Sequence, residues 1–203
     1  MHKISRKVGV SMRLIAATRN KHKLEEIYAI IKDFDIQLVP QDEAGFDIEV
    51  VEDGDSCEAN SFIKANAICK ASGEAAIADD TGLFVDALGG EPGVMTARYA
   101  GEDCSDADNR KKLLENLKGV PFEKRTACFV TVMTIVYPDG SKLVARGECP
   151  GHIAESELGD RGFGYDSVFI PLESDQTFAQ LPVEFKNGVS HRARALAKLR
   201  EML

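Results

Sequence analysis

Paired cysteines, long apolar runs and excess positive charge are all missing from this chain. The five cysteines are scattered and never form a C-x-x-C pair, which argues against a disulfide framework and against a zinc knuckle. The longest apolar run, CFVTVMTIVY, suits a buried strand and is too short to span a membrane. The formal net charge of -8 argues against a broad nucleic-acid surface. We therefore expect neither a membrane nor a nucleic acid as a partner.

Targeting segments and familiar catalytic motifs are missing as well. The first dozen residues are basic, but the apolar run LIAA that follows is too short for a signal peptide. We predict a mobile N-terminal extension over residues 1–11, with Met12 as an alternative start, and reduced thiols in a cytoplasmic protein. The chain has no phosphate-binding P-loop, no dinucleotide fingerprint, no H-E-x-x-H and no G-x-S-x-G.

What is present is the pattern of a globular α/β protein. The chain has 203 residues, of which 44% are hydrophobic and 29% charged, and this fits one domain over residues 12–203. Strand-like segments at 13–17 and 75–78 alternate with helix-like segments at 23–33, 57–73 and 105–119. Residues 126–154 read as two long strands around a Pro-Asp-Gly turn, so we expect a mixed rather than a purely parallel sheet.

Two polar clusters follow predicted strands, where open α/β sheets usually bind ligands. ATRNKHK, residues 17–23, leads into a helix whose free backbone N–H groups suit phosphate, although a solvated capped turn is the simpler interpretation. Asp79 and Asp80 end the strand AAIA and repel one another unless a cation such as Mg²⁺ offsets them, although such a pair is also a common turn element. Thr81 and Gly82 would let the chain turn there.

Three further segments carry candidate residues. The acidic loop EVVEDGDS, residues 49–56, offers a further metal ligand, although exposed acids are usually only solvated. Phe163 and Tyr165 lie in a glycine-rich turn that favours a stacking platform over core packing. In SHRARAL, residues 190–196, basic side chains in the first turn oppose the helix dipole, which indicates an anion nearby.

Together, the segments ATRNKHKLEEI, AIADDTGLFVDALGGEPGVMTARYAG, GFGYDSVF and EFKNGVSHRARAL resemble the Ham1-like inosine triphosphate pyrophosphatase family. Members of that family hydrolyse the α–β phosphoanhydride of deaminated purine nucleoside triphosphates (ITP, dITP and XTP), which cleanses the nucleotide pool. The resemblance implies a Mg²⁺-dependent cytoplasmic homodimer. It also implies an elongated mixed sheet flanked by helices, with the active-site cleft between two lobes.

The resemblance also implies roles for individual residues. Asp80 corresponds to a metal ligand and general base, and Glu52 is the best match for the second metal ligand among the acids of the loop. The implied substrate-binding residues are Thr18, Arg19, Asn20, Lys21, His22 and Lys23 for the triphosphate, Thr81 as a further substrate contact, Phe163, Gly164, Tyr165 and Asp166 for the nucleoside, Lys186 for phosphate, and His191 and Arg192 for the base. The chain departs from the family pattern at Arg19, where Gly is frequent, and at Ser167, where Pro is common.

Two other functions stay open at this point. A nucleotide-binding sensor without turnover would use the same residues, and Asp80→Asn would leave it unimpaired. A nucleic-acid-binding protein could use the aromatic turn as its stacking platform, but the acidic balance argues against it.

Overall fold

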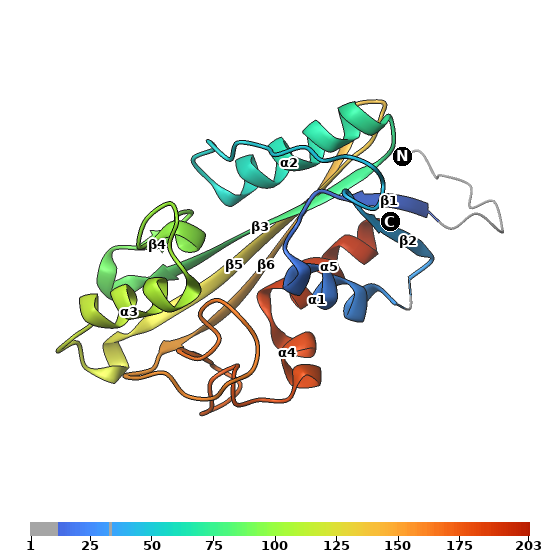
Figure 1. Ribbon diagram of the computed structural model, residues 1–203. Coiled ribbons are helices and arrows are strands. Elements are labelled where there is room, and N and C mark those ends of the chain that lie inside the picture. The colour runs from blue at the N-terminus through green and yellow to red at the C-terminus, as the bar shows by residue number, and fades with distance from the viewer. Residues whose placement is uncertain (1–11, 33) are drawn as a thin grey trace.

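The computed structural model of the protein describes residues 12–32 and 34–203, and the predicted extension over residues 1–11 lies outside this part (Figure 1). The strands of the described part are β1 (Met12–Ala16), β2 (Ile36–Pro40), β3 (Ala76–Val85), β4 (Pro92–Gly93), β5 (Thr126–Val136), β6 (Lys142–Ile153) and β7 (Phe169–Pro171). Its α-helices are α1 (Lys21–Ile31), α2 (Cys57–Ser72), α3 (Asp106–Asn116), α4 (Val183–Val189) and α5 (His191–Met202).

The strands form one mixed sheet in the order β2-β1-β3-β5-β6-β7, with β4 beside β3. β1 pairs in parallel with β2 and β3, and the remaining pairs are antiparallel. The hairpin predicted around the Pro-Asp-Gly turn is present, because β5 and β6 stay in register from Thr126–His152 to Val136–Lys142. The α/β class and the mixed sheet with flanking helices are therefore confirmed.

One edge of β3 is open in its middle. β5 pairs with the other edge along the whole strand, so β1 and β4 must share the first edge. β1 reaches only to Ile77, and β4 begins at Leu83. In the described part of the chain, residues 78–82 therefore lack a strand partner on this edge. We call this opening the β3 gap, and the candidate site lies at it.

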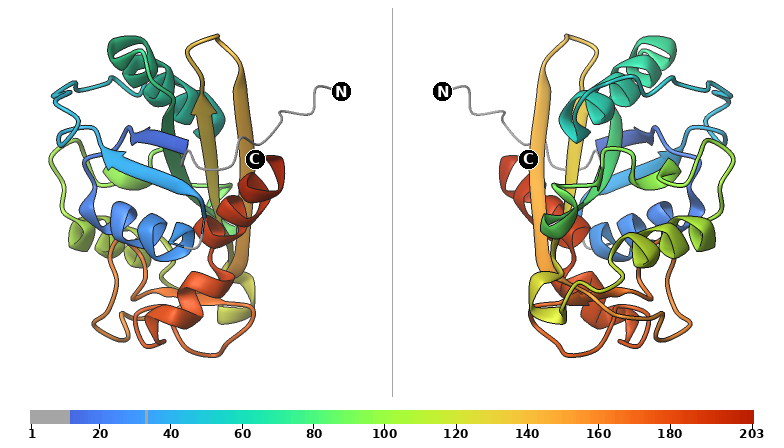
Figure 2. Two further views of the ribbon diagram at one scale, coloured as in Figure 1. Left: turned by 90° about the vertical axis from the view of Figure 1, so that its right-hand side faces the viewer. Right: turned by 90° about the vertical axis from the view of Figure 1, so that its left-hand side faces the viewer.

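Helices cover both faces of the sheet. Leu14 and Ala16 share one hydrophobic cluster with α1 and α5, whereas Ile15 shares another with α2. This division follows from the alternation of side chains along a strand. Figure 2 shows α2 on one side of the long strands and α5 on the other. A third cluster lies at the far ends of β3, β5 and β6 and includes Leu83 and Phe129.

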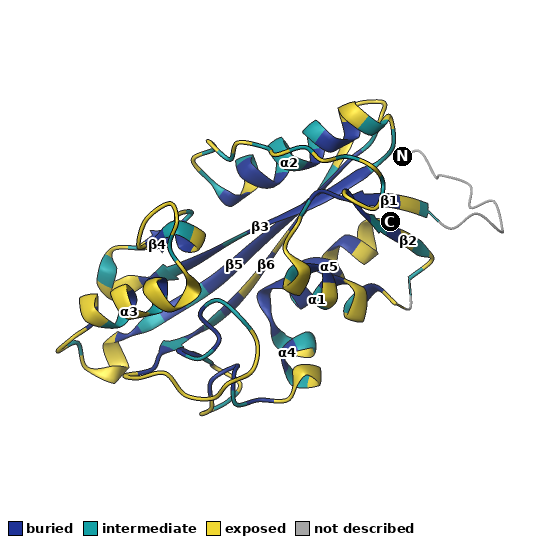
Figure 3. Ribbon diagram, in the orientation of Figure 1, coloured by how far each residue is buried: buried dark blue, intermediate teal, exposed yellow. Residues whose placement is uncertain are grey.

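Local sequence signals set the helix boundaries. Ser56 caps α2, accepting a hydrogen bond from the Ala59 N–H, and Gly73 ends it with a left-handed φ of 69°. The buried residues concentrate on the strands and on the inner faces of the helices (Figure 3). All five cysteines are free, as predicted. No helix within the described ranges is long and apolar enough to cross a membrane. That residues 12–203 form a single domain with two lobes stays a prediction.

Candidate active site

A cavity of about 460 Å³ opens at the β3 gap, a volume typical of small-molecule sites. Its wall comes from the loop before α1, the acidic loop before α2, the middle of β3, the turn around Phe163 and the start of α5. Of the residues predicted for the site, the following line the cavity: Thr18, Arg19, Asn20, His22, Lys23, Glu52, Asp80, Thr81, Phe163, Gly164, Tyr165, Asp166, Lys186, His191 and Arg192. Lys21 is an exposed residue at the start of α1 and is not part of the wall.

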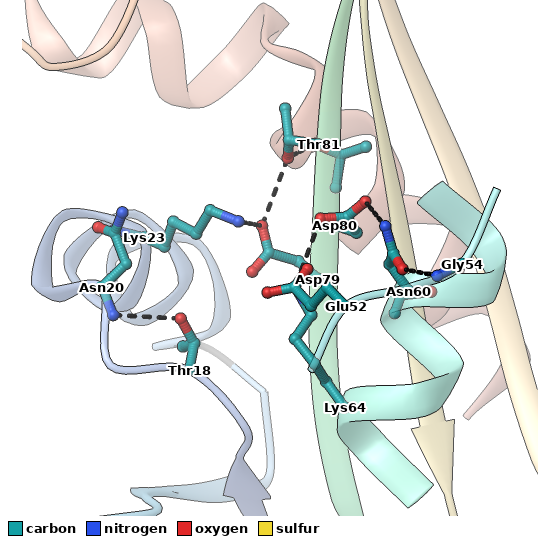
Figure 4. Close-up of polar contacts among 12 residues, drawn as sticks. Thr18, Asn20, Lys23, Glu52, Gly54, Asn60, Lys64, Asp79, Asp80 and Thr81 are labelled. Atoms are coloured by element: carbon teal, nitrogen blue, oxygen red, sulfur yellow. Dashed lines mark hydrogen bonds and ion pairs between the residues drawn. The ribbon is translucent and has the colours of Figure 1, made fainter. Parts of the chain in front are cut away.

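The loop before α1 is fixed by its own side chains. The Asn20 carboxamide caps the helix by accepting a hydrogen bond from the Lys23 N–H at 3.1 Å, and the Thr18 hydroxyl accepts one from the Asn20 N–H at 3.2 Å (Figure 4). The positive end of α1 therefore borders the cavity in a defined conformation. The exposed Arg19 guanidinium pairs with Asp47 at 2.5 Å, so this side chain already has a carboxylate partner within the protein.

The prediction that the strand ends at Asp79 and Asp80 is wrong. β3 continues to Val85, because Leu83 and Val85 are fully buried and pack in the cluster at the far end of the strands. Thr81 and Gly82 accordingly lie within the strand and do not form a turn. Consecutive side chains of a strand point to opposite faces, so Asp79 faces α1 while Asp80 faces α2 (Figure 4).

Asp79 is a buried anion between two cations. Its carboxylate accepts a hydrogen bond from Arg192 at 2.9 Å and lies 3.2 Å from the Lys23 ammonium. Burial raises the pKa of Asp79, but Lys23, Arg192 and Lys64 outweigh this effect and hold the pKa below its usual range. Asp79 therefore stays ionised and keeps Lys23 and Arg192 beside the cavity.

Asp80 has a different environment on the opposite face. Its Oδ1 lies 3.4 Å from the Lys64 ammonium, and its Oδ2 lies at the hydrogen-bond limit of 3.5 Å from the Asn60 amide. Burial raises the pKa of Asp80 and outweighs the opposing effect of Lys64 and Lys23, while Glu52 and Asp79 raise the pKa further. A carboxylate with a raised pKa is a better proton acceptor near neutral pH.

The acidic loop lies against α2 and brings Glu52 to Asp80. The Gly54 N–H donates to the Asn60 side chain at 2.9 Å, and a Cβ atom at Gly54 would lie only 2.6 Å from the same oxygen. This close approach requires glycine directly after Asp53 and sets the position of Glu52, whose carboxylate lies 2.8 Å from the Lys64 ammonium. Of the four acids in the loop, Glu49 and Glu52 line the cavity, whereas Asp53 and Asp55 are exposed.

The basic residues near the C-terminus are neutralised by carboxylates of the protein itself. The buried Lys186 ammonium lies 2.6 Å from Glu26 and 2.5 Å from Asp166. The Arg192 guanidinium, which is 1% exposed, bridges Glu26 and Asp79. The anions indicated by the sequence SHRARAL are thus protein side chains in this structure.

His191 is buried and neutral beside these charges. Burial lowers its pKa well below 6.5, and the nearby Arg192 and Lys186 lower it further. Its ring stacks on Phe129 at a centroid distance of 4.5 Å, and its Nδ1 has no hydrogen-bond partner within the described residues. His191 therefore lines the cavity as a neutral ring, and its buried Nδ1 has no partner among the described residues.

The glycine-rich turn was only half correctly interpreted from the sequence. Phe163 stacks with His22 at a centroid distance of 5.2 Å, and the Lys186 ammonium lies 4.8 Å from its ring, so this aromatic ring does face the cavity. Tyr165, in contrast, packs in the core, and its hydroxyl donates to the Thr96 carbonyl at 2.9 Å. The prediction of two rings free from core packing is therefore wrong for Tyr165, because its phenol finds a buried acceptor.

Lys64, Asn60 and Glu26 are functional candidates that the sequence reasoning missed. Asn60 and Lys64 are four residues apart on α2 and therefore share one helix face, which here points to Asp80. That spacing of polar residues in an Ala-rich helix was a usable signal. Glu26 gave no comparable signal, because its partners Lys186 and Arg192 are about 160 residues away in the sequence.

The chain matches one protein family along almost its whole described length. The sequence model of the Ham1 family matches residues 14–202. The chain belongs to the Ham1 family. A relative from Clostridium perfringens, named dITP/XTP pyrophosphatase, is 47% identical over 197 residues, covering 94% of this chain and 97% of the relative. A relative of the same name from Geobacter sulfurreducens is also 47% identical, covering 94% and 96%.

Solved structures of Ham1 proteins share the fold. The Ham1 protein of Staphylococcus aureus gives a TM-score of 0.83 at 38% identity, covering 94% of this chain and 97% of that one. The HAM1 protein from Coxiella burnetii gives a TM-score of 0.84 at 36% identity, covering 94% and 98%. The curled mixed sheet with its flanking helices is thus the fold of the Ham1 family.

Proposed function

We propose that this chain is an enzyme that hydrolyses dITP, XTP and ITP to the nucleoside monophosphate and pyrophosphate. The observation that carries the proposal is the position of Asp80, a carboxylate with a raised pKa that faces Glu52 at a cavity also lined by buried cations and an aromatic ring. The two facing carboxylates suit phosphoanhydride chemistry, and the buried cations and the aromatic ring suit a purine nucleotide. The names of the relatives, dITP/XTP pyrophosphatase, support the same substrates.

The residues at the β3 gap fit a magnesium ion. Within the described residues, no three His, Cys, Asp or Glu side chains form a metal cluster, so Glu52 and Asp80 alone would hold the ion. Mg²⁺ is commonly bound by one or two carboxylates together with water and substrate phosphates. When bound, it supplies positive charge to the phosphate oxygens.

The charge balance of the cavity supports the same cofactor. Four buried or half-buried cations, Lys23, Lys64, Lys186 and Arg192, are paired with five carboxylates, Glu26, Glu52, Asp79, Asp80 and Asp166. A fifth half-buried cation of the wall, Arg98, lies 3.8 Å from Glu102. The site therefore has no surplus of positive charge with which to bind a triphosphate. A divalent cation at Glu52 and Asp80 corrects this deficit.

Asp80 accepts the proton of the attacking water in the proposed mechanism. Lys23 and the N-terminus of α1 lie on the same side of the cavity and stabilise the negative charge of the phosphates. Asp79 contributes by holding Lys23 in place. These are electrostatic contributions, which carry most of the acceleration in reactions of phosphate groups.

His191 is the proposed reader of the base. A neutral imidazole carries one N–H, which can donate a hydrogen bond to the 6-oxo group of hypoxanthine or xanthine, where adenine carries an amino donor. Leaving a buried donor unpaired costs about 1 to 3 kcal/mol, which disfavours adenine. Burial, and after it the neighbouring Arg192, lowers the pKa of His191, so the ring stays neutral with one nitrogen as donor.

The test is pyrophosphate release from dITP, XTP, ITP, GTP and ATP with Mg²⁺. We expect turnover of dITP, XTP and ITP, and a loss of at least about 100-fold in kcat for Asp80→Asn, as for removal of a general base. Asp53→Asn is the matched control, because Asp53 is an exposed acid of the adjacent loop. EDTA should abolish turnover. A chain that binds these nucleotides without cleaving them would instead be the non-catalytic sensor.

We further propose that the protein is a cytoplasmic homodimer.

A further inference from the structure

The Lys64 ammonium lies between the two carboxylates proposed for the metal. It is 2.8 Å from Glu52 Oε2 and 3.4 Å from Asp80 Oδ1, and the side chain is only 12% exposed (Figure 4). Both contacts are ion pairs between the lysine ammonium and a carboxylate. A cation thus already bridges Glu52 and Asp80.

Lys64 differs from the other cations of the cavity in its partners. Lys23, Lys186 and Arg192 pair with Asp79, Glu26 and Asp166, none of which is proposed to bind metal. Within residues 12–32 and 34–203, Lys64 is the one cation that forms ion pairs with the carboxylates proposed to bind the metal. Metal and ammonium therefore compete for the same oxygens.

We infer that Lys64 is the resident counter-ion of the metal site, which holds Glu52 and Asp80 together in the metal-free chain and must be displaced when Mg²⁺ binds. The inference rests on the proposed function only for the identity of the two metal ligands. It explains how two carboxylates can face one another in a buried site without a metal.

Among the described residues, Asp79 is the further carboxylate that acts on the Lys64 ammonium. Asp79 is already shared by Lys23 and Arg192, and Lys64 is close enough to Lys23 for the like charges to lower the pKa of Lys23. The phosphates of an incoming nucleotide are the remaining partner for this charge. Free Mg²⁺ should therefore bind weakly, and metal and nucleotide should bind together.

Calorimetric titration of MgCl₂ alone into metal-stripped full-length protein tests the inference. Lys64→Met keeps the long apolar stem and removes the competing charge, so we expect it to bind Mg²⁺ at least about tenfold more tightly than the wild type, a change readily resolved by calorimetry. Lys64→Arg keeps the charge and should stay near the wild-type affinity. Lys70→Met is the matched control, because Lys70 is exposed in the last turn of the same helix and should not alter the affinity.

Equal or weaker Mg²⁺ binding by Lys64→Met overturns the inference, because a side chain with a purely structural role cannot strengthen binding when removed. Lys64→Gln serves if the methionine variant does not fold, as judged by circular dichroism. The rise in melting temperature on adding MgCl₂ gives a second readout and should be larger for the neutral variants. Hydrolysis of dITP by the wild type is measured on the same preparation. Tighter Mg²⁺ binding by Lys64→Met without any hydrolysis by the wild type would support the role of Lys64 and reject the proposed function. Hydrolysis by the wild type without tighter binding by the variant would support the proposed function and reject the role of Lys64.

Discussion

At the scale of single residues, the two adjacent aspartates have different electrostatic environments in the site. Asp79 points to α1 and α5 and stays ionised among cations, so it acts by holding Lys23 and Arg192. Asp80 points to α2, and burial raises its pKa, which suits the role of proton acceptor proposed for it. Pairs of groups whose environments push their pKa values apart are typical of acid–base chemistry. Here the two environments differ because consecutive side chains of β3 point to opposite faces of the sheet.

The buried, neutral His191 predicts a pH dependence of stability. Its pKa is lowered in the folded state, first by burial and then by Arg192 and Lys186, so the unfolded chain binds a proton below pH 6.5 that the folded chain does not. The free energy of unfolding should therefore fall as the pH drops below 6.5, by up to about 1.4 kcal/mol per pH unit from this group. His191→Gln should flatten this slope in urea unfolding at a series of pH values. Parallel curves for the variant and the wild type would contradict the assignment.

Residues of the site were predictable from the sequence where a charged or aromatic residue stood at a position that is locally unfavourable for it. Basic residues in the first turn of α5 and adjacent aspartates at the end of an apolar run both pointed to the cavity. The partner of a residue was not predictable, because Glu26 and Arg192 meet only through the packing of α1 against α5. Tyr165 was misjudged for the same reason, since its acceptor on Thr96 is distant in the sequence.

At the scale of elements, the position of α5 depends on a glycine in β6. A Cβ atom at Gly147 would lie 2.1 Å from the His191 carbonyl and 2.3 Å from the Ala195 N, both of which belong to the helix backbone. The absence of a side chain at Gly147 therefore lets the start of α5, with His191 and Arg192, lie directly on the sheet.

We expect Gly147→Ala to displace α5, with a loss of about 1 to 3 kcal/mol in the free energy of unfolding, the usual cost of overpacking. Because His191 and Arg192 move with the helix, KM for dITP should rise as well. Gly188→Ala in α4 is the control, since nothing lies within 4 Å of the added Cβ. Denaturant unfolding together with steady-state kinetics checks both effects. An unchanged KM in a destabilised Gly147→Ala variant would show that the start of α5 does not position the base.

Element types were predictable from periodicity and caps, but the extent of one element was not. The hairpin of β5 and β6 and the helix α2 up to Gly73 were predicted correctly, whereas the cap at Ser56 was not predicted. β3 runs past its two aspartates because β5 pairs with its full length, and a strand partner this distant leaves no local sequence signal.

At the scale of the whole molecule, the resemblance to the family predicts a homodimer. β6 pairs with β7 only at residues 151–153, so in the described part of the chain most of its outer edge has no strand neighbour. Such an edge is usually covered, and a second copy can cover it. Sedimentation velocity should give about twice the chain mass of 22.1 kDa. A single 22.1 kDa species at every concentration would contradict the prediction.

The β3 gap also bears on how the protein avoids aggregation. An open strand edge presents backbone groups that invite pairing with any other extended chain. At the gap, β1 and β4 occupy the sheet layer on either side, which limits the length of foreign strand that could align with residues 78–82. A small ligand is not subject to this limit. The open edge of β3 is thus accessible to a small ligand but poorly accessible to an extended segment of another protein.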